Sequence, residues 1–340
     1  MSLSVSKNDS SPYPLVDRFG RVHRSVRLSV TDRCNIRCFY CMPEHDAVFA
    51  PREQLLTFEE LHRLTSLLVT QMGVNRVRIT GGEPLVRREL PTLIQMLAGI
   101  PGLEDLSLTT NGVLLAEHAD ALRDAGLQRL NISLDTLDES TFQRISRRSG
   151  LAKVIEGIDA AIAAGFQSVK LNALAIAGVS EPEITRLAEF AIDRGVSIRF
   201  IEFMPLDSDR DWTSAKVLTG DRLLAILRER FGEVTPIQRA DQSQPSEDFL
   251  VGRGRVGIIR SVSEPFCGSC DRLRITADGS MRNCLFASEE TPLRELMRSG
   301  AHDQVLADQI ASCVAAKKAA HGIDDASFSP PIRPMYSIGG

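Results

Sequence analysis

Three cysteines close together near the N-terminus are the feature of this sequence that most constrains its fold and chemistry. Cys34, Cys38 and Cys41 stand in the run Thr-Asp-Arg-Cys-Asn-Ile-Arg-Cys-Phe-Tyr-Cys. Three thiolates on one short loop can hold three irons of a cubic four-iron cluster, which leaves the fourth iron open. The alternative is a zinc site, but structural zinc takes four ligands, and no histidine falls within this loop. The spacing therefore favours an open iron–sulfur cluster.

Strand-like and helical segments alternate through the first two thirds of the chain. Runs rich in Val, Ile and Leu predict strands at residues 25–30, 76–80, 106–110, 129–134, 168–176 and 197–203. Helical periodicity predicts helices between them, for example at residues 57–72, 117–125, 152–164 and 181–194. Such alternation favours parallel strands joined by right-handed crossovers. Six units predict an incomplete α/β barrel, with active residues at the carboxyl ends of its strands.

Polar residues gather where this architecture requires them. The first predicted strand runs through Thr31 and Asp32 into the cysteine loop, and the second ends in Gly-Gly-Glu-Pro at residues 81–84. The third ends in Thr-Thr-Asn-Gly at residues 109–112, and the fourth in Ser-Leu-Asp at residues 133–135. Because parallel strands present their carboxyl ends at one mouth of a barrel, we expect these groups to face one site.

A second cysteine group lies far along the chain from the first. Cys267 and Cys270 are separated by two residues, and Cys284 follows after thirteen more. Again three ligands stand together without a histidine in the interval, so this trio needs a metal centre of its own, with zinc plus one external ligand as the alternative. The seventh cysteine, Cys313, lies in an Ala-rich helical stretch and is expected to be an inert buried thiol.

Composition limits the classes of protein to which the chain can belong. The formal net charge is -4, so the chain as a whole does not indicate nucleic-acid binding, and an anionic substrate would need local cations. No stretch of about 18 apolar residues indicates a membrane span. The first 25 residues lack the apolar core of a signal peptide, and we expect a cytoplasmic protein whose cysteines bind metal.

The first cysteine run, with an aromatic residue before its last cysteine, resembles the signature of the radical S-adenosylmethionine (SAM) enzymes. The resemblance implies a (β/α)6 partial barrel and a four-iron cluster whose open iron chelates SAM. It also implies that reductive cleavage of SAM gives a 5'-deoxyadenosyl radical. SAM contacts are implied at Tyr40, Gly82, Ser133 and Met204. Without the family match, Ser133 would be an ordinary strand-end hydroxyl and Met204 a core methionine.

The second trio and the Asp-Arg-Leu-Arg run at residues 271–274 are similar to the GTP 3',8-cyclases, the molybdenum cofactor biosynthesis protein A family. The match extends from Arg27 to the final Gly339-Gly340. It implies that the open iron of a second four-iron cluster binds the guanine of GTP. It further implies hydrogen abstraction from C3' of GTP and formation of a C3'–C8 bond, giving (8S)-3',8-cyclo-7,8-dihydro-GTP, the first step of molybdenum cofactor biosynthesis. The implied GTP contacts are Arg27, Arg78, Thr109, Lys170, Arg272, Leu273 and Arg274, with Arg199 as a further phosphate partner.

Domain organisation follows from these assignments. We expect an N-terminal arm at residues 1–22, the partial barrel at 23–215 and an α+β region at 216–340 that carries the second cluster and closes the open side of the barrel. Residues 241–248 are interpreted as a polar surface insertion. Residues 329–340 are expected to lack regular structure because of their prolines. Gly339 and Gly340 are small enough to enter a confined cationic pocket and to order an arginine there.

Several further expectations rest on the resemblance. It implies no catalytic side chain beyond the cluster ligands, an electron donor of the flavodoxin or ferredoxin type, a downstream cyclic pyranopterin monophosphate synthase and a homodimer. Arg76, Arg87 and Arg88 stand off the motif positions and are expected to be ordinary surface charges. Two other functions remain open, namely a peptide-modifying radical SAM enzyme with an auxiliary cluster and a non-enzymatic iron–sulfur electron carrier.

Overall fold

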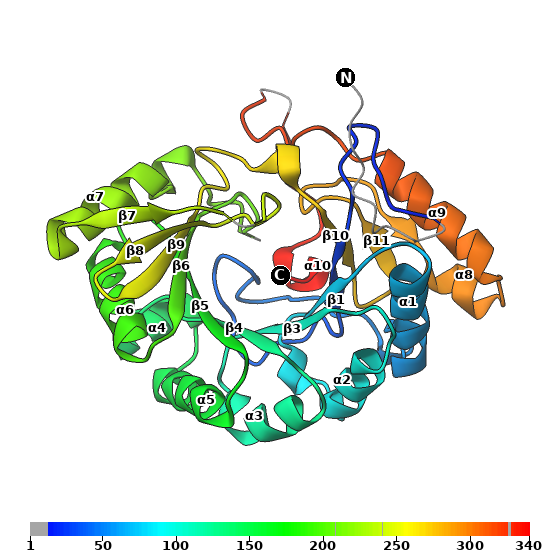
Figure 1. Cartoon of the computed structure of the whole chain (residues 1–340), viewed down its shortest axis with the longest axis horizontal. Helices are drawn as coiled ribbons and strands as arrows, with labels where there is room; N and C mark the ends of the chain where they lie inside the picture. The colour runs from blue at the N-terminus through cyan, green and yellow to red at the C-terminus, as the bar shows by residue number, and fades with distance from the viewer. Residues whose placement is uncertain (1–12, 208, 240, 326–327) are drawn as a thin grey trace.

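Six parallel strands form the centre of one curved sheet in the computed structural model, which describes residues 13–207, 209–239, 241–325 and 328–340. Residues 1–12 of the expected N-terminal arm therefore lie outside the described residues. The strands pair in chain order as β1 (Ser25–Ser29), β2 (Arg76–Thr80), β3 (Asp105–Thr110), β4 (Arg129–Ser133), β5 (Ser168–Ala175) and β6 (Ser197–Glu202). Figure 1 shows an open crescent, which confirms the incomplete barrel.

Helices cover the outer face of this sheet (Figure 1). They are α1 (Phe58–Thr70), α2 (Leu90–Ala98), α3 (Leu115–Asp124), α5 (Leu151–Ala164) and α6 (Glu181–Asp193). Helix α1 begins with a capping box, in which Thr57 and Glu60 satisfy each other's backbone N–H groups. Its Leu61, Leu64 and Leu68 are fully buried, as the apolar face of an amphipathic helix should be. An additional helix, α4 (Glu139–Ser146), is inserted between β4 and α5.

The C-terminal region lengthens the sheet at both edges. Beside β6 lie β9 (Gly254–Ile259), β8 (Glu247–Val251) and β7 (Val234–Ile237), and beside β1 lie β10 (Arg272–Ile275), β11 (Ser280–Arg282) and β12 (Thr291–Pro292). Residues 260–271 cross from one edge to the other and carry Cys267 and Cys270. This region therefore spans the open side of the barrel, as predicted.

The remaining helices belong to the C-terminal region. They are α7 (Gly220–Phe231), α8 (Arg294–Arg298), α9 (Asp303–Ala315) and α10 (Met335–Ile338). Short 3-10 turns occur in both parts of the chain, at Arg52–Gln54, Pro84–Val86, Ser214–Lys216 and Cys267–Ser269. Cys313 is buried on α9, which confirms its assignment as a buried thiol in a helix. None of the helices in the described part of the chain is long and apolar enough to cross a membrane.

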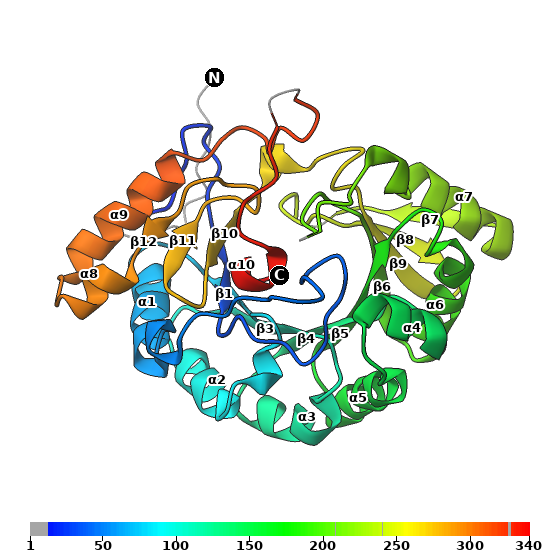
Figure 2. The same ribbon diagram turned by 180° about the vertical axis from the view of Figure 1, so that it is seen from behind.

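Two expectations about irregular segments were wrong. Residues 335–338 form the helix α10, because Pro334 stands at its start, where a proline costs no hydrogen bond, and its carbonyl accepts from the N–H groups of Ser337 and Ile338. Residues 241–248 are not wholly a surface insertion, since Ser246 is fully buried and β8 begins at Glu247. Figure 2 shows α10 inside the curve of the sheet, close to the C-terminus.

Candidate functional site

A cavity of about 360 Å³ lies inside the curve of the sheet. Its wall includes the carboxyl ends of the parallel strands, the loop after β1 and the crossing segment 260–271. All six cysteines of the two trios line it, namely Cys34, Cys38, Cys41, Cys267, Cys270 and Cys284. Two motifs separated by more than two hundred residues in the sequence therefore share one chamber.

The first trio occupies the loop that follows β1. The loop is held by backbone hydrogen bonds from Cys41 N and Met42 N to the carbonyl of Cys38, both 2.9 Å, and by the Arg37 guanidinium, which donates to the Cys34 carbonyl at 2.7 Å. Burial raises the pKa of all three thiols, to about 11 for Cys34. Such weakly acidic thiols ionise when a metal cation binds them. The donor set therefore fits a cluster that supplies positive charge.

The cysteine side chains of each trio are not arranged as the ligands of a single metal ion. Within the described residues, no three His, Cys, Asp or Glu side chains converge tightly enough to hold one metal ion. Each thiolate of a cubane binds a different iron, so cluster ligands stand farther apart than the ligands of one ion.

The glycine run after β2 packs against the cysteine loop. Gly82 N donates to Thr31 O at 2.7 Å and Glu83 N to Arg33 O at 2.8 Å. A Cβ on Gly82 would stand only 2.4 Å from the carbonyl oxygen of Arg33, and one on Gly81 would stand 2.7 Å from that of Thr31. The glycines are therefore needed so that two backbones can meet, which places the strand end directly beside the first trio.

Glu83 organises the floor of the cavity beside this run. Its carboxylate accepts hydrogen bonds from the Thr110 hydroxyl at 2.7 Å, from Asn111 N at 2.7 Å and from Leu85 N at 3.0 Å. Burial raises the pKa of Glu83 to about 7 against these three donors. The Asn111 side chain in turn stands 3.6 Å from the Cys34 sulfur. By binding the Asn111 backbone N–H, Glu83 thus holds the Asn111 side-chain amide beside the first trio.

The four expected SAM-contact residues, Tyr40, Gly82, Ser133 and Met204, all line the cavity. The Tyr40 hydroxyl donates to Asp135 Oδ2 at 2.7 Å, and Asp135 Oδ1 accepts from Leu174 N at 2.8 Å. Asp135 is a residue of the β4 end, and it ties the cysteine loop to β4 and β5. The sequence placed Asp135 at the mouth of the barrel without indicating this partner.

The second trio has a different electrostatic surrounding. An Arg272 N–H donates to the Cys270 sulfur at 3.3 Å, and Lys317 Nζ stands 3.7 Å from the same sulfur. Although burial raises the pKa of Cys270, the charges of Arg272 and Lys317 lower it to about 7. Lys317 is only 3% exposed. The sequence contained no signal for Lys317, because Lys317 and its exposed neighbour Lys318 look alike at the end of an Ala-rich stretch.

Three arginines from adjacent strands form a row inside the barrel. Arg27 on β1 is in register with Arg274 on β10 and with Arg78 on β2. Burial and the neighbouring guanidinium charges lower the pKa of all three, to about 9 for Arg274. Within the described residues, none of the three is paired with a carboxylate. A buried row of like charges is costly unless an anion binds to it, so this arginine row fits an anionic ligand.

The other expected GTP contacts lie in different places. Thr109 and Arg272 line the cavity with the arginine row. Lys170 and Arg199 stand on β5 and β6 without lining it, although burial followed by the charges of Arg199, Arg129 and Arg78 lowers the pKa of Lys170 to about 8. The Leu273 side chain is fully buried in the core, because it alternates along β10 with two arginines that face the cavity.

Two of the three expected surface charges are not ordinary ones. Arg76 binds Asp241 at 2.5 Å and Asp271 at 2.7 Å, at the edge of a second, more open cavity beside the other face of the second cysteine loop. Arg87 donates to the carbonyls of Val30 and Leu56 and stacks on the Phe58 ring. Both arginines join separate segments. Only Arg88 is exposed as expected.

Comparisons with known families agree with this geometry. The radical SAM superfamily matches residues 28–191, and the Molybdenum Cofactor Synthesis C family matches residues 196–323. A GTP 3',8-cyclase of Rhodopirellula baltica is 62% identical, covering 98% of this chain and 94% of that protein. A GTP 3',8-cyclase of Corynebacterium glutamicum is 44% identical, covering 96% of this chain and 89% of that protein. GTP 3',8-cyclase 2 of Mycobacterium bovis is 46% identical, covering 96% of this chain and 92% of that protein.

A solved structure supports the fold alone. SuiB of Streptococcus suis, bound to its precursor peptide SuiA, superposes with a TM-score of 0.53 at 15% identity, covering 81% of this chain and 60% of that one. Of the functions left open by the sequence, the high identity to the cyclases over nearly the whole chain separates this protein from the peptide-modifying enzymes and from electron carriers. The chain therefore belongs to the GTP 3',8-cyclase family within the radical SAM superfamily.

Proposed function

We propose that this protein converts GTP into (8S)-3',8-cyclo-7,8-dihydro-GTP in the first step of molybdenum cofactor biosynthesis. The observation that carries the proposal is the arginine row of Arg27, Arg78 and Arg274, which lines one cavity together with both cysteine trios. A triphosphate has several charges to satisfy buried guanidinium groups, and arginine pairs well with phosphate oxygens. The identity to named cyclases supports the same substrate.

The first trio would hold a four-iron cluster with SAM on its open iron, beside Tyr40, Gly82, Ser133 and Met204. When bound, this cluster and SAM supply the 5'-deoxyadenosyl radical that takes the hydrogen from C3' of GTP. The role of the chain is to bring the two ligands together and to exclude water from them. Gly82 keeps the strand end against the cysteine loop, and Asp135 holds Tyr40 in place.

The second trio would hold the other four-iron cluster, whose open iron takes the guanine. GTP would then lie between the trios, with Thr109 and Arg272 beside it and its phosphates against the arginine row. The proposed set of GTP contacts also includes the backbone of Leu273. Lys170 and Arg199 belong to it as well, because their charges act on Arg78 of the arginine row although neither side chain lines the cavity. This orientation places the phosphates against the arginine row because guanidinium groups pair with phosphate oxygens, which leaves the guanine facing the open iron. No side chain other than the cluster ligands is proposed to react.

Further partners are part of this proposal. An electron donor of the flavodoxin or ferredoxin type would reduce the first cluster, and a cyclic pyranopterin monophosphate synthase would consume the product. A homodimer and a cytoplasmic location, where thiols stay reduced, complete the expectation.

The proposal is tested by incubating the anaerobically reconstituted protein with SAM, dithionite and one nucleotide at a time. GTP should give 5'-deoxyadenosine together with a cyclised isomer of GTP, detected by mass spectrometry. ATP should give neither above background, because adenine has an amino group where guanine offers its oxygen. Equal products from ATP, or deoxyadenosine without any cyclised isomer of GTP, would contradict the proposed activity.

A further inference from the structure

The C-terminal tail, residues 328–340, enters the cavity along a defined path. Figures 1 and 2 both place α10 inside the curve of the sheet, near β1 and β10. Tyr336 is 4% exposed and Ile338 is 1% exposed, so the tail is buried where it ends. Met335, Tyr336 and Gly340 line the cavity, whereas Arg333 is not among its lining residues. Contacts made outside the cavity, before α10, can therefore set the position at which the tail enters.

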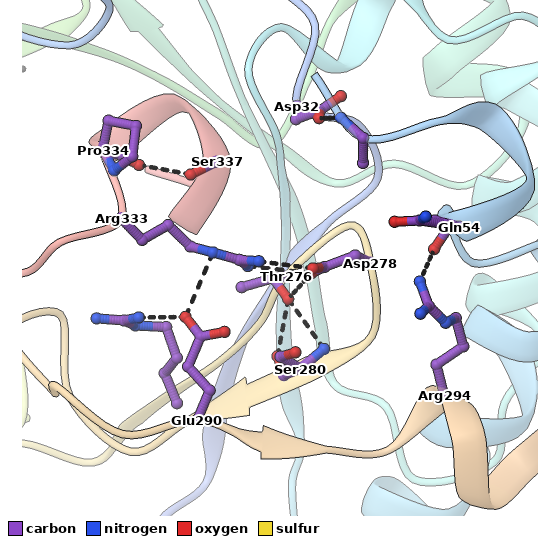
Figure 3. Close-up of polar contacts among 12 residues, drawn as sticks. Asp32, Gln54, Thr276, Asp278, Ser280, Glu290, Arg294, Arg333, Pro334 and Ser337 are labelled. Carbon is purple, nitrogen blue, oxygen red and sulfur yellow. Dashed lines mark hydrogen bonds and ion pairs between the residues drawn. The ribbon is translucent and has the colours of Figure 1, made fainter. Parts of the chain in front are cut away.

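Arg333 is bound by carboxylates just before α10. Figure 3 shows its guanidinium reaching Asp278, to which it donates two hydrogen bonds of 3.0 and 2.6 Å. Glu290 Oε1 stands 3.4 Å from Arg333 Nε and is shared with the buried Arg282. Although burial raises the pKa of Asp278, the hydrogen bonds from Arg333 and from Thr276 bring it below its ordinary value. We call the set Arg333, Asp278 and Glu290 the tail clasp.

Asp278 lies in the turn between β10 and β11, which is held by close packing and by hydrogen bonds. Gly279 has a φ of +82°, and a Cβ there would stand 2.8 Å from Arg294 Cβ and 2.9 Å from Leu56. The Thr276 hydroxyl accepts from Ser280 N at 2.9 Å. Neighbouring segments also hold this turn, because Leu56 N donates to the Ala277 carbonyl at 2.9 Å. The acceptor of the clasp is therefore fixed relative to β10.

The other end of the tail meets the arginine row. The Arg274 guanidinium donates to the Gly339 carbonyl, and Arg274 lies on the same strand that leads into the Asp278 turn. A Cβ on Gly339, whose φ is +91°, would stand 2.8 Å from Ser29 Cβ and 3.0 Å from the Thr80 hydroxyl. Gly339 thus occupies a space that no other residue fits without displacement. Small errors in the path of the tail would break this contact.

A third contact ties the tail to the first cysteine region. The Tyr336 hydroxyl donates to the Val48 carbonyl at 3.1 Å, and its ring packs edge to face on Phe49. Residues 48 and 49 follow the first trio in sequence, while the clasp lies next to β10 in the C-terminal region. The tail is therefore held at one side by an ion pair and at the other by an aromatic contact, with Gly339 between Arg274 on β10 and Ser29 on β1.

We propose that Arg333 is a positioning residue: its ion pair with Asp278 sets the path of the tail so that the Gly339 carbonyl reaches Arg274. This inference rests on the proposed function, because it assigns the ordered tail the task of shaping the chamber in which GTP cyclises. Arg333 itself does not line the cavity. Loss of the clasp should therefore leave SAM cleavage intact and reduce the fraction of cleavage events that yield cyclised GTP.

The test compares Arg333→Gln and Asp278→Asn with the matched control Arg294→Gln, in the anaerobically reconstituted full chain. Arg294 is close to the same turn and donates to the Gln54 carbonyl without contacting the tail (Figure 3). Hydrogen exchange at Ser337, Ile338 and Gly339, whose N–H groups are hydrogen-bonded within the tail, reports its order. Both clasp variants should speed this exchange by about tenfold or more, the scale of a lost charged hydrogen bond.

The same samples are assayed for 5'-deoxyadenosine and for cyclised GTP. If the clasp positions the tail, both clasp variants should form deoxyadenosine at nearly the wild-type level but with a lower ratio of cyclised GTP to deoxyadenosine. Hydrogen exchange at β4 should be unchanged, and Arg333→Lys should recover part of the ratio. The proposal would be overturned by unchanged hydrogen exchange in the tail or by an equal effect in Arg294→Gln. It would also be overturned by faster exchange at β4 in both clasp variants or by an unchanged product ratio. A wild type that cyclises no GTP would refute the proposed function instead, while tail exchange would still test the clasp.

Discussion

Lys317 Nζ stands 3.7 Å from the sulfur of Cys270 and 2.8 Å from the carbonyl oxygen of Arg272. A buried ammonium beside a cluster thiolate balances the negative charge that the cluster gains on reduction. Lys317→Met should therefore lower the reduction potential of the second cluster by about 60 mV or more, since 59 mV corresponds to a tenfold change for one electron. The measurement is an anaerobic redox titration followed by electron paramagnetic resonance.

The adjacent Lys318 is the matched control, because it is exposed and its side chain has no contact with the trio among the described residues. Lys318→Met should leave the potential as in the wild type. Identical potentials in the two variants would return Lys317 to a purely structural role.

The two trios should bind iron independently. Replacing Cys34, Cys38 and Cys41 with serine should remove about half of the iron, since each cubane holds four, and abolish SAM cleavage. Replacing Cys267, Cys270 and Cys284 should also remove half, yet leave slow deoxyadenosine formation without cyclisation. Iron analysis and product assays check both. Zinc in place of iron at the second trio of the wild type would contradict the guanine-binding role.

Arg272→Ala and Arg274→Ala should each weaken GTP binding by about 1.5 to 3 kcal/mol, the scale of a charged hydrogen bond. SAM cleavage without GTP should hardly change, because neither side chain contacts the first trio. Arg88→Ala is the control, since Arg88 is exposed. Calorimetric titration under anaerobic conditions measures the affinity, and the assignment fails if both variants bind GTP like the control.

Asp17 should make stability depend on acidity. Although burial raises its pKa, hydrogen bonds from His23 and Arg21 lower it from 3.8 to about 2. A depressed carboxylate pKa adds stability that is present above the unfolded value and is lost as the pH falls through the folded value. Asp17→Asn should therefore lose about 2 kcal/mol of unfolding free energy at pH 7, and the deficit should shrink from about pH 4 toward pH 2.

Denaturant unfolding of Asp17→Asn at several pH values measures this deficit. Asp120→Asn, on the exposed face of α3, serves as the control and should stay near the wild type throughout. A deficit for Asp17→Asn that is constant from pH 7 to pH 3 would show that a lost contact, and not linked ionisation, explains it.

The central strands were predictable because each is a short apolar run bounded by polar residues. The predicted bounds of β1 to β6 differ from the observed ones by a single residue at most at either end, as for β3, which begins at Asp105. The C-terminal strands were harder, since β11 and β12 are only three and two residues long. Their pairing depends on partners far away in the sequence, and no local pattern encodes it.

The functional site, like the fold, was predictable from the sequence only in part. Cysteine spacing identified both trios and the family resemblance identified the arginines, but the register that aligns Arg27 with Arg78 and Arg274 exists only in the folded sheet. Arg76 looked like a surface charge because its partner Asp241 is 165 positions away. Likewise, Arg333 finds Asp278 across 55 positions. Long-range ion pairs of this kind leave no periodic signal in a sequence.

The most direct test of the account follows a hydrogen atom. GTP carrying deuterium at C3' is incubated anaerobically with the reconstituted protein, SAM and dithionite, and 5'-deoxyadenosine is analysed by mass spectrometry. The account predicts one deuterium in deoxyadenosine and its loss from the cyclised nucleotide, because the proposed arrangement places GTP between the two trios with its ribose toward the first. Unlabelled deoxyadenosine formed alongside a cyclised product that retains its deuterium would contradict it.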